Sequence, residues 1–299
     1  MPLFKTSNQK AQKLLRKDFA NEKELQHFVE TNLEELFGIR FLASEYSTNH
    51  GGRIDSLGLD ENNSPVIIEY KWGENSAIIN QGLFYLDWLV DHIAEFQLLV
   101  QKKIAQDVEV DTGSPRLILI AASYSKFDEY AINRMAENIE MWSYNQYPDL
   151  FELKLVASSQ AKKVENGKKV TKVNYDSYSV EDQLEGKSEK VKELFNELQE
   201  RILAFDSEGM IEELARKMYI AYRTNKNFVY LNFRSDRILV DVAMVVEHIT
   251  SLDASDPAKV RDMRAIGHHG AGYTRYELSS LDQLDEAVAL IRESYEQTK

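Results

Sequence analysis

Two short apolar segments in the first quarter of the chain have the alternating pattern of β-strands and yet carry acidic residues. They span residues 52–58 and 65–72, and the polar stretch between them is typical of a tight turn, which predicts antiparallel neighbours. Successive side chains on a strand point to opposite faces, so Glu69 and Lys71 share one face. Asp55 on the neighbouring strand can face them. The pattern therefore predicts a cluster of charged side chains on one sheet.

The hydrophobic periodicity of the following residues predicts helices and strands in mixed order. Residues 115–122 form an uninterrupted apolar run, which is typical of a strand buried on both faces. The other predicted elements are a helix over 25–33, a long helix that opens at Gln81, a helix over 127–144 and a strand over 151–157. Together they predict an α/β domain over residues 1–175, in which helices flank a mixed sheet.

The second part of the chain has its own pattern and predicts a separate domain. Residues 176–188 are polar and acidic, and we interpret them as a linker. Residues 189–299 then form a smaller α+β domain, since 299 residues are enough for two hydrophobic cores. Its predicted elements are helices over 189–205 and 281–291 and strands over 217–222, 227–233 and 237–242.

The acidic residues in the predicted strands have two readings. A strand keeps an ionised carboxylate only if the group is paired, bound to a cation or open to a cleft. Two converging carboxylates, with the backbone carbonyl of Tyr70 beside them, form a hard oxygen site that suits Mg²⁺ or Mn²⁺. Lys71 can there orient or deprotonate a water or offset phosphoryl charge, which favours metal-dependent phosphodiester hydrolysis. A buried Asp–Lys–Glu ion network that fixes strand register fits the same spacing, and the spacing alone leaves both open.

With these residues in this order, the first half of the chain resembles the PD-(D/E)xK nuclease superfamily, and within it the NucS-like and RecB-like branches. The resemblance rests on Asp55, on Glu69-x-Lys71, on Gln81-x-x-x-Tyr85, and on the order helix, strands, helix. Ile54 stands where the superfamily is named for a proline, a residue that the NucS-like branch also lacks.

The resemblance implies a restriction-endonuclease-like core and a role for each matching residue. Asp55 and Glu69 would ligate Mg²⁺ or Mn²⁺ together with the carbonyl of Tyr70. Lys71 would serve catalysis, and Glu30, an acid on the preceding helix, would assist metal binding. The residues that the resemblance assigns to holding the DNA strand are Gln81 and Tyr85.

The resemblance also bears on partners and location. NucS-like enzymes that cut both strands act as dimers, so a homodimer is expected by resemblance. Residues 189–299 resemble a small domain of unknown function that travels with such nucleases and is sometimes labelled a predicted transport protein; a further, unidentified partner is expected for it. The longest apolar stretch, residues 77–100, is interrupted by charges and cysteine is absent, so we expect a cytoplasmic protein without membrane spans or disulfides.

The net charge of −13 argues against a uniformly basic DNA-binding surface. Phosphate contacts need only local cationic patches, and two are visible, although each also fits ordinary solubility. One is the N-terminal run Lys5, Lys10, Lys13, Arg16 and Lys17, and the other flanks a predicted hairpin turn at residues 166–167. The residues predicted from the sequence to contact DNA are Arg53, Lys162, Lys163, Lys168 and Lys169.

Two functions from different classes stay open at the level of sequence. The first is a metal-dependent DNA nuclease acting in repair or defence. The second is a non-catalytic module that binds nucleic acid or protein on a nuclease-like scaffold. The retained acids and lysine favour the nuclease, because a scaffold has no need to keep charges within a sheet.

Overall fold

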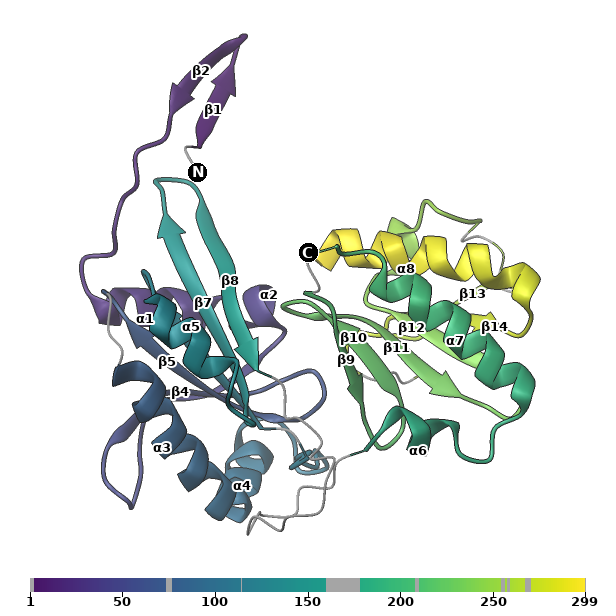
Figure 1. Ribbon diagram of the computed structural model, residues 1–299, viewed down its shortest axis with the longest axis horizontal. Coiled ribbons are helices and arrows are strands. Elements are labelled where there is room, and N and C mark those ends of the chain that lie inside the picture. The colour runs from purple at the N-terminus through teal and green to yellow at the C-terminus, as the bar shows by residue number, and fades with distance from the viewer. Residues whose placement is uncertain are drawn as a thin grey trace. The chain divides into compact units, whose positions relative to one another are not determined.

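The chain forms two compact units, which are described separately below (Figure 1). A computed structural model describes residues 3–73, 77–113, 115–159, 178–207, 210–253, 256, 259–266 and 270–298. Unit 1 comprises Met1–Glu34 and Ile39–Tyr175, and unit 2 comprises Glu35–Gly38 and Asp176–Lys299.

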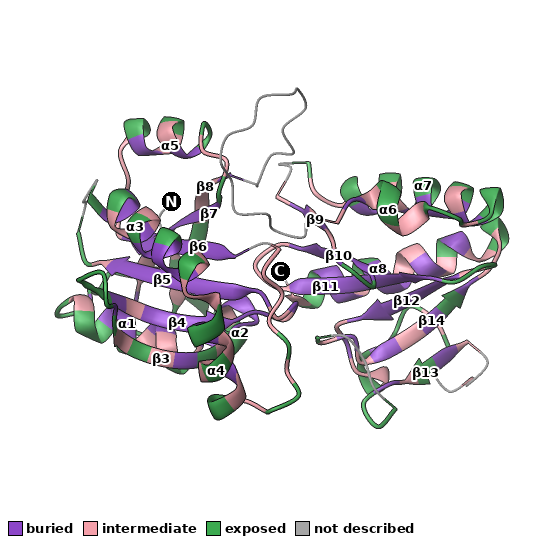
Figure 2. Ribbon diagram, turned by 90° about the horizontal axis from the view of Figure 1, so that it is seen from below, coloured by how far each residue is buried: buried purple, intermediate pink, exposed green. Residues whose placement is uncertain are grey.

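Unit 1 is built on a six-stranded mixed sheet in the order β3-β4-β5-β6-β7-β8. The strands are β3 (Arg40–Ser47), β4 (Arg53–Leu59), β5 (Pro65–Lys71), β6 (Arg116–Ala121), β7 (Asn138–Gln146) and β8 (Phe151–Ser159). The three strands β5, β6 and β7 run parallel, and the remaining neighbours are antiparallel. The central strands β5 and β6 are buried except for Lys71 at the end of β5, and their purple colour in Figure 2 shows this burial. The predicted α/β class and mixed sheet are confirmed.

Helices cover both faces of this sheet. They are α1 (Glu22–Thr31), α2 (Leu33–Phe37), which continues into unit 2, α3 (Ala77–Asp91), α4 (Ile93–Lys103) and α5 (Lys126–Ile132). Helix α3 approaches closely where Gly82 meets Leu117 and Leu119, since a Cβ there would lie 2.7 Å from the Leu117 side chain. Helix α1 packs on the opposite face, where its Glu30 accepts a hydrogen bond from Ser56.

The helix predicted over residues 127–144 is wrong. Helix α5 ends at Ile132, and the apolar residues that follow belong to strand β7. Ile139 and Met141 pair with the parallel strand β6 on one side and the antiparallel strand β8 on the other. Pairing on both edges satisfies the backbone of a fully buried segment, and it outweighs the local helical spacing.

A hairpin at the N-terminus was not predicted. Strands β1 (Phe4–Ser7) and β2 (Lys10–Lys13) pair with each other alone, and every residue in them is exposed. Asn8 and Gln9 form the turn with positive φ angles of 49° and 63°. The two residues thus take the left-handed conformation that a two-residue hairpin loop requires.

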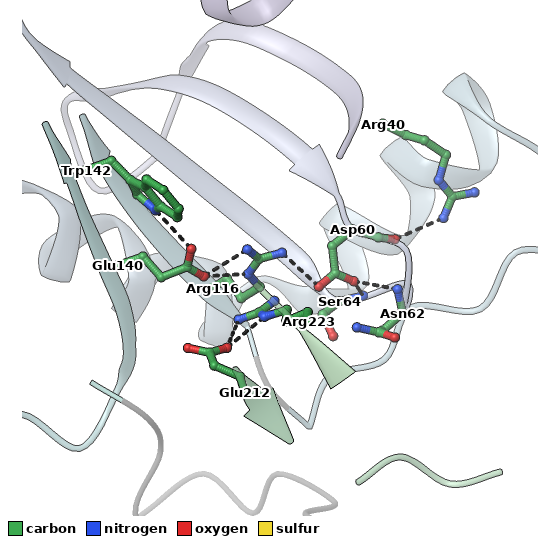
Figure 3. A network of polar contacts seen from close by, with 9 residues as sticks. All are labelled: Arg40, Asp60, Asn62, Ser64, Arg116, Glu140, Trp142, Glu212 and Arg223. Carbon is green, nitrogen blue, oxygen red and sulfur yellow. Dashed lines mark hydrogen bonds and ion pairs between the residues drawn. The ribbon is translucent and has the colours of Figure 1, made fainter. Parts of the chain in front are cut away.

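A buried charge network ties three strands or strand ends of unit 1 together (Figure 3). Arg116, at the start of β6, is 1% exposed and donates to Glu140 on β7 at 2.8 and 3.0 Å and to Asp60 at 3.2 Å. Glu140 also accepts from the indole Nε1 of Trp142, and Asp60 accepts from two backbone N–H groups of the β4–β5 turn. The network fixes the turn and the amino end of β6 in register.

Unit 2 is a six-stranded antiparallel sheet with helices packed on it, in the order β13-β14-β12-β11-β10-β9. Its strands are β9 (Glu212–Ala215), β10 (Ile220–Arg223), β11 (Asn227–Phe233), β12 (Ile238–Val242), β13 (Val260–Asp262) and β14 (Thr274–Leu278). Its helices are α6 (Val180–Leu184), α7 (Glu189–Leu203) and α8 (Leu284–Thr298), with 3₁₀ turns η1 (Val246–His248) and η2 (Leu281–Gln283). Buried ion pairs such as Arg223–Glu212 lie within this sheet.

Part of the segment interpreted as a linker is folded. Helix α6 occupies residues 180–184, and Ser179 caps it by accepting from the backbone N–H of Asp182 at 3.1 Å. Across the part of the chain that the structure describes, no helix combines the length and the apolar character needed to cross a membrane.

Candidate active site

The carboxylates of Asp55 and Glu69 meet where strands β4 and β5 separate. The antiparallel ladder pairs Ser56 with Ile68, which places Asp55 opposite Glu69 at the next position. There each carboxylate replaces a ladder bond: Glu69 Oε1 accepts from Asp55 N at 3.1 Å, and Asp55 Oδ2 accepts from Tyr70 N at 3.1 Å. The backbone itself therefore holds both side chains in place.

Burial raises the pKa values of both carboxyl groups, because it destabilises their ionised forms. Glu69 is fully buried, and burial together with the neighbouring Asp55 carboxylate raises its pKa to about 9. Burial also raises the pKa of Asp55, although its hydrogen bond from Tyr70 N acts in the opposite direction. Two adjacent carboxyl groups whose pKa values are both raised are typical of a site that exchanges a proton for a cation.

Lys71 ends strand β5 beside this pair and is held by a residue that we did not predict. Its Nζ donates to Glu22 Oε1 at 3.0 Å, and Glu22 Oε2 accepts from the backbone N–H of Trp72 at 3.2 Å. The Lys71 side chain is 18% exposed, so it is not fully buried with the sheet. Lys71 thus donates its hydrogen bond to a residue of α1. In the alternative interpretation, a closed ion network of Asp55, Lys71 and Glu69, it would donate to a carboxylate of the sheet.

Gln81, Tyr85 and Arg53, which were predicted to contact DNA, differ from one another in their contacts. Gln81 on α3 donates from Nε2 to Glu69 Oε2 at 2.7 Å and so orients that carboxyl group. Tyr85 is 5% exposed, and its hydroxyl accepts from Arg53 N at 2.9 Å. Its ring lies so close to Gly52 that a Cβ there would be 2.7 Å from the hydroxyl, so Tyr85 anchors the β3–β4 turn to α3. The Arg53 side chain is exposed and forms an ion pair with Glu45.

Glu30 lies on the α1 face of the sheet. Its Oε1 accepts from Ser56 Oγ at 2.6 Å and from Gln26 Nε2 at 3.0 Å. Gln26 also donates to the backbone carbonyl of Asp55 at 2.8 Å, which links α1 to the candidate site. Tyr70 contributes its side chain to this second face, where its hydroxyl lies within hydrogen-bonding distance of Ser56 Oγ, at 3.1 Å. The metal-binding role of Glu30 stays a prediction, as does that of the Tyr70 carbonyl.

The hairpin lysines predicted to contact DNA lie outside the described residues. They are Lys162, Lys163, Lys168 and Lys169. The residue that sequence reasoning missed is Glu22. Its signal is Asn21, which caps α1 by accepting from Glu24 N at 2.9 Å and starts the helix three residues before the predicted residue 25.

Replacing Glu69 with glutamine is expected to stabilise the protein more as the pH rises. The native state holds the Glu69 proton up to a pKa of about 9, whereas the ordinary value is 4.5, so the native state loses stability between these pH values as the pH increases. Glutamine keeps a neutral side chain and removes that loss, which these two pKa values put at roughly 4 kcal/mol in the free energy of unfolding between pH 5 and pH 8. Urea unfolding at both pH values measures it.

The matched control is Glu34→Gln, on the exposed Glu34 of α2, which is expected to change stability by the same small amount at both pH values. If Glu69→Gln were instead destabilised by several kcal/mol at pH 8, Glu69 would be an ionised member of a structural network.

The comparisons with known proteins cover different shares of the chain. Residues 180–298 match the family described as "Domain of unknown function (DUF5655)". A protein of Haemophilus influenzae described as uncharacterized is 26% identical over 311 residues, covering 98% of this chain and 99% of that protein. These two findings describe relatives without a stated activity.

Two solved structures are similar to part of the chain. A repair endonuclease from Pyrococcus abyssi has a TM-score of 0.28 and 17% identity, covering 44% of this chain and 51% of that one. A complex titled "EndoMS-dsDNA2" has a TM-score of 0.26 and 17% identity, covering 42% of this chain and 47% of that one. The chain thus spans about half the length of these two proteins.

Proposed function

We propose that this protein is a metal-dependent DNA nuclease that hydrolyses phosphodiester bonds with Asp55, Glu69 and Lys71. The observation that carries the proposal is geometric: backbone N–H groups hold the Asp55 and Glu69 carboxyl groups next to each other, and Lys71 ends the same strand as Glu69. A purely structural carboxyl pair gains nothing from such a position, since burial without a cation destabilises both ionised groups.

The donors at this site fit Mg²⁺ or Mn²⁺. Asp55 and Glu69 would bind the ion through carboxylate oxygens, and the Tyr70 carbonyl is the third proposed ligand. Among the described residues, no group of three or more His, Cys, Asp or Glu side chains is arranged to hold a metal. Magnesium commonly binds through one or two carboxylates and completes its shell with water and substrate phosphate, so this small set is sufficient. Bound there, the ion supplies Lewis acidity and lowers the pKa of a water.

The remaining residues position these groups. Gln81 holds the Glu69 carboxyl through its 2.7 Å hydrogen bond, and release of the Glu69 proton makes that carboxylate available. Glu22 sets the direction of the Lys71 side chain, whose ammonium group offsets phosphate charge and orients the scissile group. The proposed substrate is DNA; a homodimer and a partner for unit 2 stay predictions.

The proposal is tested by cleavage assays on duplex, single-stranded, mismatched and branched DNA with Mg²⁺, Mn²⁺ or a chelator. We expect cleavage of at least one substrate with either metal and none with the chelator. Calorimetric titration with Mn²⁺ is expected to show one site per chain that Asp55→Asn with Glu69→Gln removes, with proton release on binding. Absence of both metal binding and cleavage in folded protein would favour the non-catalytic binding module.

A further inference from the structure

Trp72 directly follows Lys71 and combines a fixed position with an open ring. It is 49% exposed, although tryptophan is the largest apolar side chain in the protein. Its indole N–H and its backbone N–H nevertheless both donate hydrogen bonds to neighbouring residues. Its indole Nε1 donates to the carbonyl of Phe19 at 2.7 Å, and its backbone N–H donates to Glu22 at 3.2 Å.

A third contact completes the restraint. Tyr144, near the end of β7, donates from its hydroxyl to the carbonyl of Trp72 at 3.3 Å. Below it, the rings of Phe19, Phe28, Tyr144 and Phe151 pack against one another. An exposed aromatic ring that is already immobilised has lost its conformational entropy before a ligand arrives, which favours binding through its free surface.

Cations lie at the same edge of the sheet. Strands β5 and β7 are both parallel to β6, so their last residues, including Lys71 and Gln146, lie at one edge. The chain after the β1–β2 hairpin is fixed there, since Arg16 Nη2 donates to the Tyr144 carbonyl at 3.4 Å and Lys17 N donates to the Gln146 carbonyl at 2.8 Å. A rigid aromatic surface beside cations is the combination that binds an unpaired base and its phosphate.

We propose that Trp72 is a stacking platform for an unpaired DNA base next to the scissile phosphate, with Arg16 and Lys17 contacting the adjoining backbone. The inference rests on the proposed nuclease function and deepens it, because it assigns the substrate class. DNA with a single-stranded or extruded base is preferred to fully paired duplex, in which the base faces are already stacked.

The protein offers a direct readout of this contact. Of its three tryptophans, Trp88 is 1% exposed and Trp142 is 7% exposed, so quenching of tryptophan emission by a stacked base reports on Trp72. The experiment uses two hairpin duplexes in chelator, where no cleavage occurs. One carries a single bulged adenosine, and the other carries an abasic bulge at the same position, so that the two share their phosphates and differ by one base.

For wild-type protein we expect about tenfold tighter binding to the bulged adenosine by fluorescence anisotropy, together with saturable quenching. Trp72→Ala is expected to bind both probes equally. Trp72→Phe, which keeps an aromatic ring and guards against misfolding of the alanine variant, is expected to keep most of the preference. Phe127→Ala is the matched control, since Phe127 on α5 is exposed and its loss should leave the preference unchanged.

Equal binding of the two probes by wild type, absence of binding to both, or a preference that persists in Trp72→Ala would overturn the inference. The outcome is separable from the proposed function. Base-dependent binding without cleavage in metal would refute the nuclease and leave the platform standing, whereas metal-dependent cleavage without base preference would refute the platform alone. An RNA hairpin with the same bulge shows whether the sugar contributes.

Discussion

Replacing Lys71 with alanine is expected to lower metal-dependent DNA cleavage by about 10²–10⁴-fold while metal still binds. The lysine stands beside the carboxyl pair but donates its hydrogen bond to Glu22, so its removal takes away a cation near the phosphate and leaves Asp55 and Glu69 in place. Single-turnover cleavage on the preferred substrate measures the loss, and calorimetry with Mn²⁺ checks that the metal site is intact.

The control for this prediction is Lys103→Ala, since Lys103 is an exposed lysine at the end of α4. Its cleavage rate is expected to match wild type within about twofold, which separates loss of a specific group from loss of general positive charge. Wild-type activity in Lys71→Ala would show that the lysine takes no part in the reaction.

Replacing Arg116 with methionine is expected to destabilise unit 1 by about 3–5 kcal/mol. Methionine fills a similar volume, but the buried carboxylates of Asp60 and Glu140 each lose a charged donor. Urea unfolding at pH 7 measures the loss.

A charge-free triple variant provides the matched comparison. Arg116→Met combined with Asp60→Asn and Glu140→Gln is expected to recover a substantial part of the lost stability, because no buried charge remains in the triad. Arg134→Met, at an exposed position after α5, should change stability by less than about 0.5 kcal/mol. If Arg116→Met were as stable as Arg134→Met, the network would contribute little to the fold.

Some of the candidate site follows from local sequence. The alternation in residues 52–58 and 65–72 predicts β4 and β5, and the polar turn between them predicts their antiparallel pairing. Period-two alternation then brings Asp55, Glu69 and Lys71 to one place, as the structure shows. These inferences succeed because strand alternation and tight turns depend on residues that are adjacent in the chain.

Other features depend on partners that are distant in the chain. Helical spacing over residues 127–144 was misleading because β7 is defined by pairing with β6 and β8. Tyr85, expected from the resemblance to hold DNA, is committed to the backbone of Arg53, 32 residues away. Glu22 reaches Lys71 across 49 residues, a contact that no local pattern encodes.

The sequence by itself determined the α/β class, the strand pair, and the gathering of two acids and a lysine, since each follows from local periodicity. Only the tertiary structure decided which charged side chains pair with one another. It turned Lys71 toward Glu22, raised the pKa of the buried Glu69, and fixed the Trp72 ring in an exposed position. The physical reason is that burial and charge pairing are set by side chains from different elements, and those meet only when the sheet and its helices have packed.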